Sequence, residues 1–231
     1  MSTVLLVEDD ALVRRFVAMA LDGMAVNLVE QCSIAGALAW LGTGRADLVL
    51  TDLSLSDGSG LELLRWLARN TQCRVAVFSA GVTPLVAREI ERIGVWRVLH
   101  KPVSLAQLQT CVLEGTAPAP DVRASEDVLG GNGDVVQRFF GGDRALFDNY
   151  CAACRTQFAR DMKAGDDALR LEDLQALSRL GHSLHTVLQM LGHPAEAHQA
   201  RALERAAGMG RASETHAQWA LLSGALSRLS T

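Results

Sequence analysis

Two stretches near the start of the chain decide its fold: Val4-Leu-Leu-Val-Glu-Asp-Asp10 and Asp47-Leu-Val-Leu-Thr-Asp-Leu-Ser-Leu-Ser-Asp-Gly-Ser-Gly-Leu61. In each stretch a short apolar run stops at an acidic residue. Two later apolar runs, Val75–Phe78 and Val98–His100, are also followed by a polar residue. Short apolar runs separated by helix-like segments are typical of parallel strands that are buried on both faces. The first half of the chain is therefore predicted to be an α/β domain.

Helical patterns separate the apolar runs. We expect helices at Ala11–Leu21, Ser33–Leu41, Gly60–Arg69, Pro84–Ile93 and Ser104–Leu113. Pro84 and Pro102 stand where a helix begins and where a strand has ended. Five strand–helix units of this kind predict a doubly wound, five-stranded parallel sheet with right-handed crossovers, spanning residues 1–115.

Polar residues stand at the ends of the apolar runs. Glu8 and Asp9 follow the first run, Asp52 the second, Ser79 the third and Lys101 the fourth. In open parallel sheets a ligand sits at the carboxyl ends of the strands, so these side chains are expected to lie together. Crowded carboxylates raise one another's pKa, and a divalent cation would offset that cost. Mg²⁺ prefers oxygen ligands and leaves room for a phosphate.

With Phe78-Ser-Ala80 and His100-Lys-Pro102, these stretches resemble the receiver domain of two-component response regulators, over roughly the first half of the chain. The resemblance implies a flavodoxin-like fold and a phosphate acceptor at Asp52. It implies that Ser79 binds the phosphoryl group and that Lys101 pairs with it. It also implies a Mg²⁺ ion held by Glu8, Asp9, Asp52 and the backbone carbonyl of Ser54.

Two positions depart from the receiver pattern. Val98 stands where the family often has an aromatic switch residue, and Ser56 replaces the usual proline after Asp52. Allostery through an aromatic flip is therefore not expected. This favours a relay, whose output is the phosphate itself, over a regulator that undergoes a strong change of shape.

Composition excludes several classes of protein. The chain has 231 residues, 49% of them apolar, and a net charge of −4 without a dense basic stretch, which argues against nucleic-acid binding. It has no apolar run long enough to span a bilayer and no signal-peptide pattern. Five scattered cysteines suit reduced thiols and a cytoplasmic location. Cys151-Ala-Ala-Cys154 has a redox spacing, but it lies within a helical pattern, and we interpret both residues as part of a helix face.

The second half of the chain has a different organisation. Gly115-Thr-Ala-Pro-Ala-Pro-Asp121 has no apolar periodicity and predicts a linker, residues 116–129, and Gly130-Gly-Asn-Gly133 is a further break. Beyond it, apolar residues recur only at helical spacing. Gly192 is expected to end one helix and Pro194 to begin the next. Residues 130–231 are therefore predicted to form an antiparallel, four-helix-type bundle.

One histidine is placed for chemistry in Leu180-Gly-His-Ser-Leu-His-Thr-Val-Leu-Gln-Met-Leu-Gly192. His182 stands two positions before Leu184 of the apolar stripe and is expected to point away from that stripe, accessible on a rigid helix. A neutral imidazole is nucleophilic near pH 7, which suits reversible phosphoryl transfer.

This segment resembles a histidine phosphotransfer (Hpt) domain, whose pattern is His-Ser-Leu-Lys-Gly with a glycine ten positions after the histidine; here Gly192 stands ten after His182. The resemblance extends from Gly130 to the C-terminus and implies that His182 carries phosphate. Two neighbours depart from the pattern. His185 replaces the lysine, so it can offset phosphoryl charge only when protonated, and Thr186 replaces the glycine and adds bulk.

The chain is thus expected to be a phosphorelay protein that is not itself a kinase. Its expected partners are a histidine kinase, other receivers or Hpt proteins, with no nucleic acid and no membrane insertion. One alternative is a receiver-gated docking or decoy module whose bundle does not transfer phosphate. Another is a Mg²⁺-dependent phosphohydrolase with Asp52 as nucleophile, although Ser54 is a poor general acid. A zinc site at His182, His185, His193 and His198 is a further, less favoured interpretation.

Overall fold

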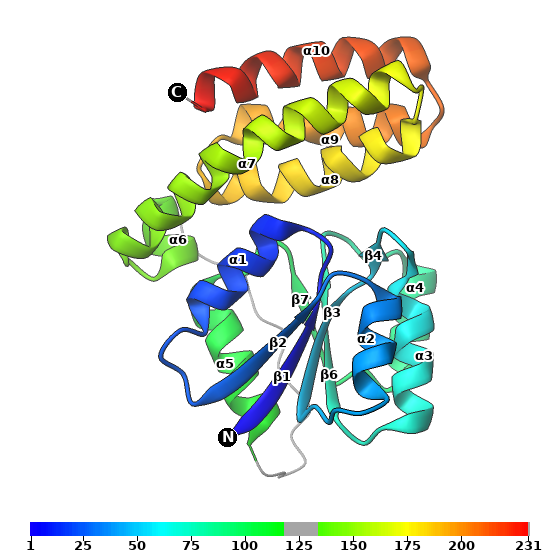
Figure 1. Cartoon of the computed structure of the whole chain (residues 1–231), viewed down its shortest axis with the longest axis vertical. Helices are drawn as coiled ribbons and strands as arrows, with labels where there is room; N and C mark the ends of the chain where they lie inside the picture. Colours follow the sequence, from blue (N-terminus) through cyan, green and yellow to red (C-terminus); the bar gives the residue numbers. More distant parts are fainter. Residues whose placement is uncertain (118–133, 231) are drawn as a thin grey trace. The chain divides into compact units, whose positions relative to one another are not determined.

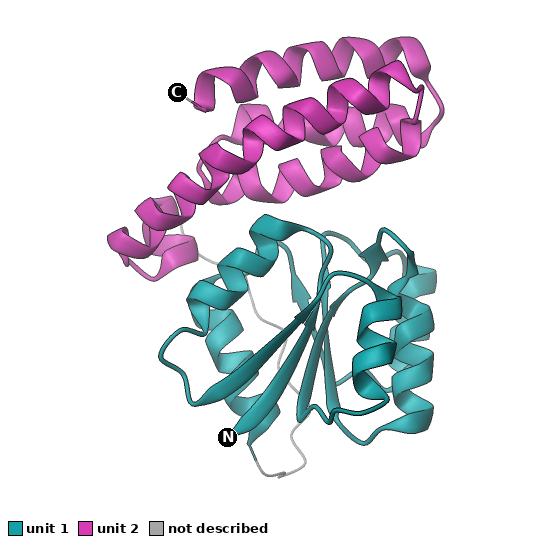
Figure 2. Cartoon of the chain, in the orientation of Figure 1, with its two compact units in different colours: residues 1–133 teal, residues 134–231 magenta. Residues whose placement is uncertain are grey.

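The computed structural model describes residues 1–117 and 134–230. The chain divides into two compact units, unit 1 from Met1 to Gly133 and unit 2 from Asp134 to Thr231 (Figure 2). Most of the expected linker 116–129 lies outside the described residues, as does the Gly130–Gly133 break. The expected domain boundaries therefore stay a prediction.

Unit 1 is a five-stranded parallel sheet in the order β2-β1-β3-β6-β7, with helices on both faces (Figure 1). The predicted doubly wound sheet is confirmed. Its elements are β1 (Ser2–Val7), α1 (Ala11–Ala20), β2 (Val26–Gln31), α2 (Ile34–Leu41), β3 (Leu48–Asp52), α3 (Gly60–Asn70), β6 (Arg74–Ser79), α4 (Pro84–Ile93), β7 (Arg97–His100) and α5 (Leu105–Thr116). A two-stranded hairpin, β4 (Ser54–Leu55) with β5 (Gly58–Ser59), follows β3.

The helices of unit 1 begin where a polar side chain caps them. The N-cap side chain accepts a hydrogen bond from a backbone N–H of the first turn, which satisfies a donor that has no partner within the helix. Asp10 caps α1 in this way, and the corresponding residues of the other helices are Ser33, Ser59, Thr83 and Ser104.

The core of unit 1 lies between the sheet and its two helical layers. Helices α1 and α5 pack together on one side, and α2, α3 and α4 follow one another on the other side. Every residue of β3 is buried, as expected for the central strand of a parallel sheet. β2 is only partly buried because it is an edge strand, and its sequence, VNLVEQ, has no continuous apolar run.

Unit 2 consists of helices over its described residues. They are α6 (Val135–Phe140), α7 (Arg144–Arg170), α8 (Leu174–Met190), α9 (Pro194–Gly208) and α10 (Ala212–Leu229). Helix α8 packs on α9, α9 on α10, and α7 on both α8 and α10, so the four long helices enclose a common core. The helical prediction for this region is confirmed.

Three-residue turns join the long helices, which makes chain neighbours antiparallel. The middle residue of each turn has a left-handed backbone: Glu172 with φ 53°, Gly192 with φ 81° and Gly210 with φ 72°. Glycine is the usual residue at this position after a helix because it has no Cβ to clash. Gly192 and Pro194 end and begin helices where the sequence predicted.

A buried tryptophan fastens α10 to α7. Trp219 packs against Gly165, where an added Cβ would collide with the indole ring. Its Nε1 donates a hydrogen bond to Oδ1 of Asp166 at 2.8 Å, so the polar end of the ring is satisfied. The absence of a side chain at Gly165 is what lets the two helices approach at this point.

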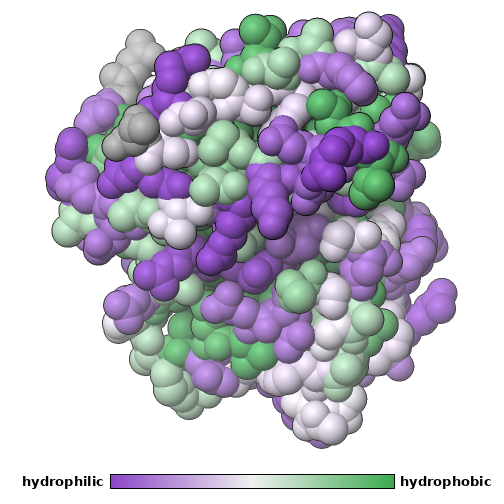
Figure 3. Space-filling view, turned by 45° about the horizontal axis from the view of Figure 1, so that its top comes forward, coloured by the Kyte–Doolittle hydropathy of each residue, from purple (hydrophilic) through white to green (hydrophobic). Residues whose placement is uncertain are grey.

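The surface is a mixture of polar and apolar residues. Figure 3 shows hydrophilic and hydrophobic side chains interspersed over the face that it presents. The large exposed apolar side chains lie on separate elements and include Leu85, Leu113, Leu171, Met209 and Leu221. Within the described residues, we find no helix with the length and apolar character needed to cross a membrane.

Candidate functional site

The strand ends bring the predicted residues of unit 1 to one edge of the sheet. β1 pairs with β3 in a register that places Glu8 and Asp52 at adjacent strand ends. β6 carries Ser79 at its last position, and β7 beside it ends at His100, one residue before Lys101. The switch in strand order falls at β1, so this is the edge at which a ligand is expected.

Lys101 joins the two carboxylates at the centre of this edge. Its Nζ lies 2.7 Å from Oε2 of Glu8 and 2.7 Å from Oδ2 of Asp52. The side chains of Lys101, Glu8 and Asp52 are only 5%, 1% and 4% exposed. Burial alone would lower the pKa of Lys101, but the two carboxylates raise it above its ordinary value. The ammonium therefore stays charged and holds the carboxylates together.

Negative charge still exceeds positive charge at the site. Burial raises the pKa of Glu8 to about 8; Lys101 opposes this shift, and the charges of Asp52 and Asp10 add to it. Burial also raises the pKa of Asp9, with a further contribution from Asp52. A second cation near these carboxylates would stabilise their ionised forms.

The expected three-carboxylate metal set is not assembled in this structure. Among the described residues, no three His, Cys, Asp or Glu side chains have the arrangement of a metal site. At this edge the reason is that Lys101 lies between Glu8 and Asp52. The donor chemistry nevertheless fits Mg²⁺, because the side chains are oxygen donors and carry more negative charge than Lys101 balances.

Asp52 is held at both of its oxygens. Oδ2 accepts the hydrogen bond from Lys101, and Oδ1 accepts one from the backbone N–H of Ser54 at 3.1 Å. Ser79 is buried on the next strand, but its hydroxyl donates to the carbonyl of Gly81 at 3.0 Å. The structure thus places Asp52, Glu8 and Lys101 in contact, and in it the hydroxyl of Ser79 is turned to its own loop.

Two residues that support the site were not predicted. The carboxylate of Asp57 accepts hydrogen bonds from the N–H groups of Ile34 and Ala35, both at 3.0 Å, which ties the loop after Asp52 to the start of α2. Gly60 begins α3 so close to Asp52 that an added Cβ would collide with the Asp52 carbonyl oxygen. The Asp57-Gly58 dipeptide was an available turn signal for this loop.

The two departures from the receiver pattern have simple structural counterparts. The hydroxyl of Ser56 interacts with the carboxylate of Asp9 and lowers its pKa, an interaction that a proline could not supply. Val98 lies in β7 beside Val77 of β6, as an ordinary sheet residue.

The sequence predicted an accessible His182 that points away from the apolar stripe of its helix. In the structure its ring instead contacts the neighbouring helix α9. Its Nδ1 lies 3.0 Å from Oε1 of Glu204 on α9. The contact is possible because α9 passes very close to α8: an added Cβ at Gly181 would lie 2.8 Å from both the Ala200 carbonyl oxygen and the Glu204 nitrogen. Sequence reasoning missed Glu204, which no local pattern singles out.

His185 is also directed to α9. Its Nδ1 lies 3.0 Å from the carbonyl oxygen of Ala197, which can only accept, so Nδ1 carries a hydrogen and donates a hydrogen bond to this oxygen. Thr186 follows His182 by four residues and therefore lies on the same side of α8. The zinc interpretation is wrong for the described residues, since no histidine cluster there has metal geometry. Neither Cys151 nor Cys154 is in a disulfide, and burial raises the pKa of Cys151, opposite to what a reactive thiolate needs.

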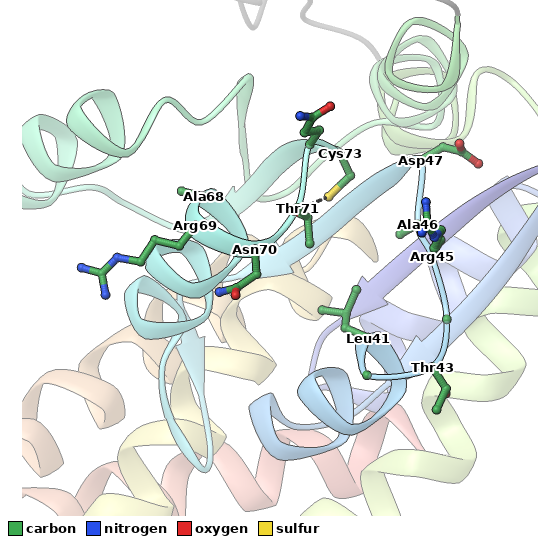
Figure 4. A pocket seen from close by; sticks show the side chains of 13 residues that line it. Leu41, Thr43, Arg45, Ala46, Asp47, Ala68, Arg69, Asn70, Thr71 and Cys73 are labelled. Atoms are coloured by element: carbon green, nitrogen blue, oxygen red, sulfur yellow. Dashed lines mark hydrogen bonds between the residues drawn. The ribbon is translucent and has the colours of Figure 1, made fainter.

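A hollow of about 1000 Å³ lies at the opposite edge of the sheet, between the loops that lead into β3 and β6 (Figure 4). Thr71 and Cys73 line it, with Oγ1 and Sγ 3.2 Å apart, whereas Arg69 extends away from it. It lies at the amino ends of the strands, far along them from Asp52, and its charged side chains do not converge. We assign it no chemical role.

Comparison with known proteins identifies the first unit. Residues 4–113 match the family described as "Response regulator receiver domain". This segment, with its parallel sheet and its Asp52–Lys101–Glu8 edge, is therefore a response regulator receiver domain. A domain of this class is a phosphoryl-accepting module and indicates two-component phosphorelay signalling.

Two curated relatives show how far the likeness extends. The KDP operon transcriptional regulatory protein KdpE of Escherichia coli is 32% identical over 138 residues, covering 54% of this chain and 59% of KdpE. The sensor histidine kinase AruS of Pseudomonas aeruginosa is 31% identical over 198 residues, covering 80% of this chain and 19% of AruS. The chain thus spans less than two thirds of either relative. Among solved structures, the chemotaxis response regulator CheY4 of Vibrio cholerae is 20% identical, with a TM-score of 0.46 over 49% of this chain and 97% of CheY4.

Proposed function

We propose that this chain is a phosphorelay protein in which Asp52 accepts a phosphoryl group and His182 exchanges it with a receiver aspartate. The observation that carries the first half is the contact of Lys101 with Asp52 at the carboxyl edge of a receiver sheet. The proposed domains are the receiver at 1–115, a linker at 116–129 and an Hpt bundle at 130–231.

The receiver residues divide the work of phosphoryl transfer. An oxygen of Asp52 would attack the phosphorus atom of the donor, and the donor group would leave. Lys101 already contacts Asp52 and would pair with the transferred oxygens, while Ser79 would bind them after its hydroxyl turns from Gly81. Glu8, Asp9, Asp52 and the Ser54 carbonyl would hold Mg²⁺, which supplies positive charge against the incoming phosphate.

Two observations support the Hpt assignment. The four long helices of unit 2 present His182 on α8 with one ring nitrogen fixed by Glu204. The alignment with the sensor histidine kinase AruS covers 80% of 231 residues, or about 185, and must therefore include both Asp52 and His182 wherever it begins. The helical unit thus has a counterpart in a protein named as a sensor histidine kinase.

The partners that we propose follow from this chemistry. A histidine kinase or another Hpt protein would supply phosphate to Asp52, and a receiver, either this one or another, would exchange phosphate with His182. The decoy alternative predicts the same labelling of Asp52 but no exchange at His182, so one assay separates the two.

The test is phosphorylation by acetyl phosphate, with and without Mg²⁺, followed by mass spectrometry of the modified residue. We expect labelling to require Mg²⁺ and Asp52→Asn to abolish it. Equal labelling of wild type and Asp52→Asn would remove the assignment of Asp52 as the phosphate acceptor. A purified phosphorylated receiver is then mixed with the Asp52→Asn variant or with the Asp52→Asn/His182→Gln double variant. Phosphate transfer to the first variant but not to the second supports the relay. Transfer to neither variant supports the decoy alternative.

A further inference from the structure

The first turn of α2 takes its capping groups from two different segments of unit 1. The hydroxyl of Ser33 accepts a hydrogen bond from the N–H of Gly36 at 3.0 Å, as a local N-cap does. The N–H groups of Ile34 and Ala35 donate instead to the two carboxylate oxygens of Asp57, both at 3.0 Å. Such donors have no acceptor within their own helix. A residue that lies 22 positions after Ala35 therefore completes the N-terminus of α2.

The loop that carries Asp57 begins at the proposed phosphate acceptor. Ser54, at the start of this loop, donates its N–H to Oδ1 of Asp52 at 3.1 Å. Leu55 is 6% exposed and belongs to the same apolar cluster as Ile34 of α2. Asp57 follows in the turn of the β4–β5 hairpin. The loop is thus held by the Asp52 carboxylate at one end and by α2 at the other.

The contact between Asp57 and α2 is charged but open to water. Burial would raise the pKa of Asp57, but the hydrogen bonds from Ile34 and Ala35 hold it below its ordinary value. The carboxylate is therefore ionised near neutral pH, and the N-terminus of a helix favours a negative charge. Asp57 is nevertheless an exposed residue, so water can replace its two backbone donors. A contact of this kind can break and form again without unfolding the domain.

Phosphorylation would change the other end of the loop. One oxygen of Asp52 forms a bond to phosphorus, and the leaving group of the donor departs with the electrons of the bond that breaks. The phosphoryl oxygens are strong hydrogen-bond acceptors placed beside the N–H of Ser54. A loop that moves toward them pulls on Asp57, three residues further along. Because Val98 stands in place of the aromatic switch residue, a route through this loop has the advantage of needing no aromatic side chain.

We propose that Asp57 couples the state of Asp52 to α2: when a phosphoryl group occupies Asp52, the loop moves toward it and the Asp57 carboxylate leaves the N-terminus of α2. This inference rests on the proposed acceptor function of Asp52. Coupling between two sites is reciprocal for binding equilibria. Removing the cap in advance must therefore strengthen the binding of a phosphoryl mimic by the factor by which that mimic weakens the cap.

The first experiment measures amide exchange in α2 by NMR in the full-length chain. Spectra are compared in Mg²⁺ buffer with and without beryllofluoride, a reversible mimic of a phosphoryl group on a carboxylate. In the wild type, the amides of Ile34 and Ala35 should exchange about 5-fold faster or more when beryllofluoride is present, the lower end of typical couplings. In Asp57→Ala they should exchange about 2- to 30-fold faster than in the wild type without the mimic, and they should no longer respond to it.

Two variants control for the general stability of α2. Ser33→Ala removes the local cap, so exchange should become faster at Gly36 while the response of Ile34 and Ala35 to beryllofluoride persists. Asp52→Asn should keep both caps and lose the response. Loss of the response in Ser33→Ala as well would mean that Asp57 only stabilises the helix, and it would overturn the proposal.

The second experiment measures the Kd of beryllofluoride in Mg²⁺ buffer. Asp57→Ala should bind it more tightly than the wild type, by about the factor seen in amide exchange. The matched control is Asp143→Ala, which removes a carboxylate cap from α7 of unit 2, where Asp143 accepts from the N–H of Leu146 at 2.8 Å; it should bind like the wild type.

Weaker binding in Asp57→Ala would overturn the proposal, because the cap would then support the bound state. Binding to the wild type with no change in α2 would overturn the coupling and leave the acceptor function of Asp52 intact. An absence of binding, together with no labelling of Asp52 by acetyl phosphate, would refute the acceptor function and the coupling with it.

Discussion

Removing Lys101 is predicted to destabilise the receiver unit strongly. In Lys101→Ala, two nearly buried carboxylates lose the ammonium that each contacts at 2.7 Å. Breaking a buried ion pair by removing one partner typically costs about 3–5 kcal/mol, because a buried charge is left without compensation. The expected loss in the free energy of unfolding is therefore about 3–5 kcal/mol near pH 8.

The loss should depend on pH in a defined direction. Glu8 has a folded-state pKa of about 8, above its ordinary value of 4.5, so between these values the folded state binds more protons than the unfolded state. Stability therefore falls as pH rises through this window. Without Lys101, which opposes the shift, the pKa of Glu8 rises further, and each pKa unit is worth about 1.4 kcal/mol. The variant should lose stability more steeply than the wild type, with a smaller deficit at pH 5 than at pH 8.

Hydrogen exchange with mass spectrometry can follow unit 1 within the intact chain. A loss of 3–5 kcal/mol corresponds to protection of β1 and β3 amides that is lower by about 150- to 5000-fold. The control is Lys163→Ala, since Lys163 is an exposed lysine on α7, and its effect on these amides should be within about 0.5 kcal/mol. A deficit below about 1 kcal/mol, the range of surface pairs, would refute the reasoning. So would a deficit that is the same at pH 5 and pH 8.

Four further substitutions test particular positions. Asp9→Asn should stabilise unit 1 at pH 7 and leave its stability unchanged at pH 3, because the raised pKa of Asp9 means that its ionised form opposes folding; protection of β1 amides at the two pH values measures this. Gly165→Ala should destabilise unit 2 by about 1–3 kcal/mol, because the added Cβ would collide with Trp219. Amide hydrogen exchange should then become faster in α7 and α10 but not in unit 1. Gly181→Ala should cost a similar amount and shift the His182 ring ¹⁵N signals, whereas Gly224→Ala, whose added Cβ meets nothing closer than 3.9 Å, should stabilise α10 by about 0.5–1 kcal/mol.

The receiver fold could be predicted because its signals are local. An apolar run such as Leu48–Thr51, followed by Asp52, predicts a strand that is buried on both faces and shows where the strand ends. Helices α3 and α4 begin at Gly60 and Pro84, as their sequence patterns predicted. β2 gave a weaker signal, since an edge strand is only half buried.

The parts that could not be predicted depend on pairs that are distant in sequence. Glu204 lies 22 residues after His182, and their contact requires the close approach of α8 and α9 at Gly181. The position of Lys101 between Glu8 and Asp52 likewise follows from the lengths of the strands and loops. The expected metal ligands stay a prediction, and the structure pairs two of them, Glu8 and Asp52, with an ammonium. The linker and its neighbouring glycines lie outside the described residues, so their role stays a prediction.

Because Lys101 is buried, the amines of this chain should differ in their reactivity toward amine-specific reagents. Of 22 basic residues, only Lys101 and Lys163 are lysines, and the others are arginines. Lys163 is exposed, whereas the side chain of Lys101 is 5% exposed and hydrogen-bonded to two carboxylates. An amine-specific reagent should therefore modify the N-terminus and Lys163 and spare Lys101. The rate at which Lys101 is modified would then measure how often the carboxyl edge of the sheet opens to solvent.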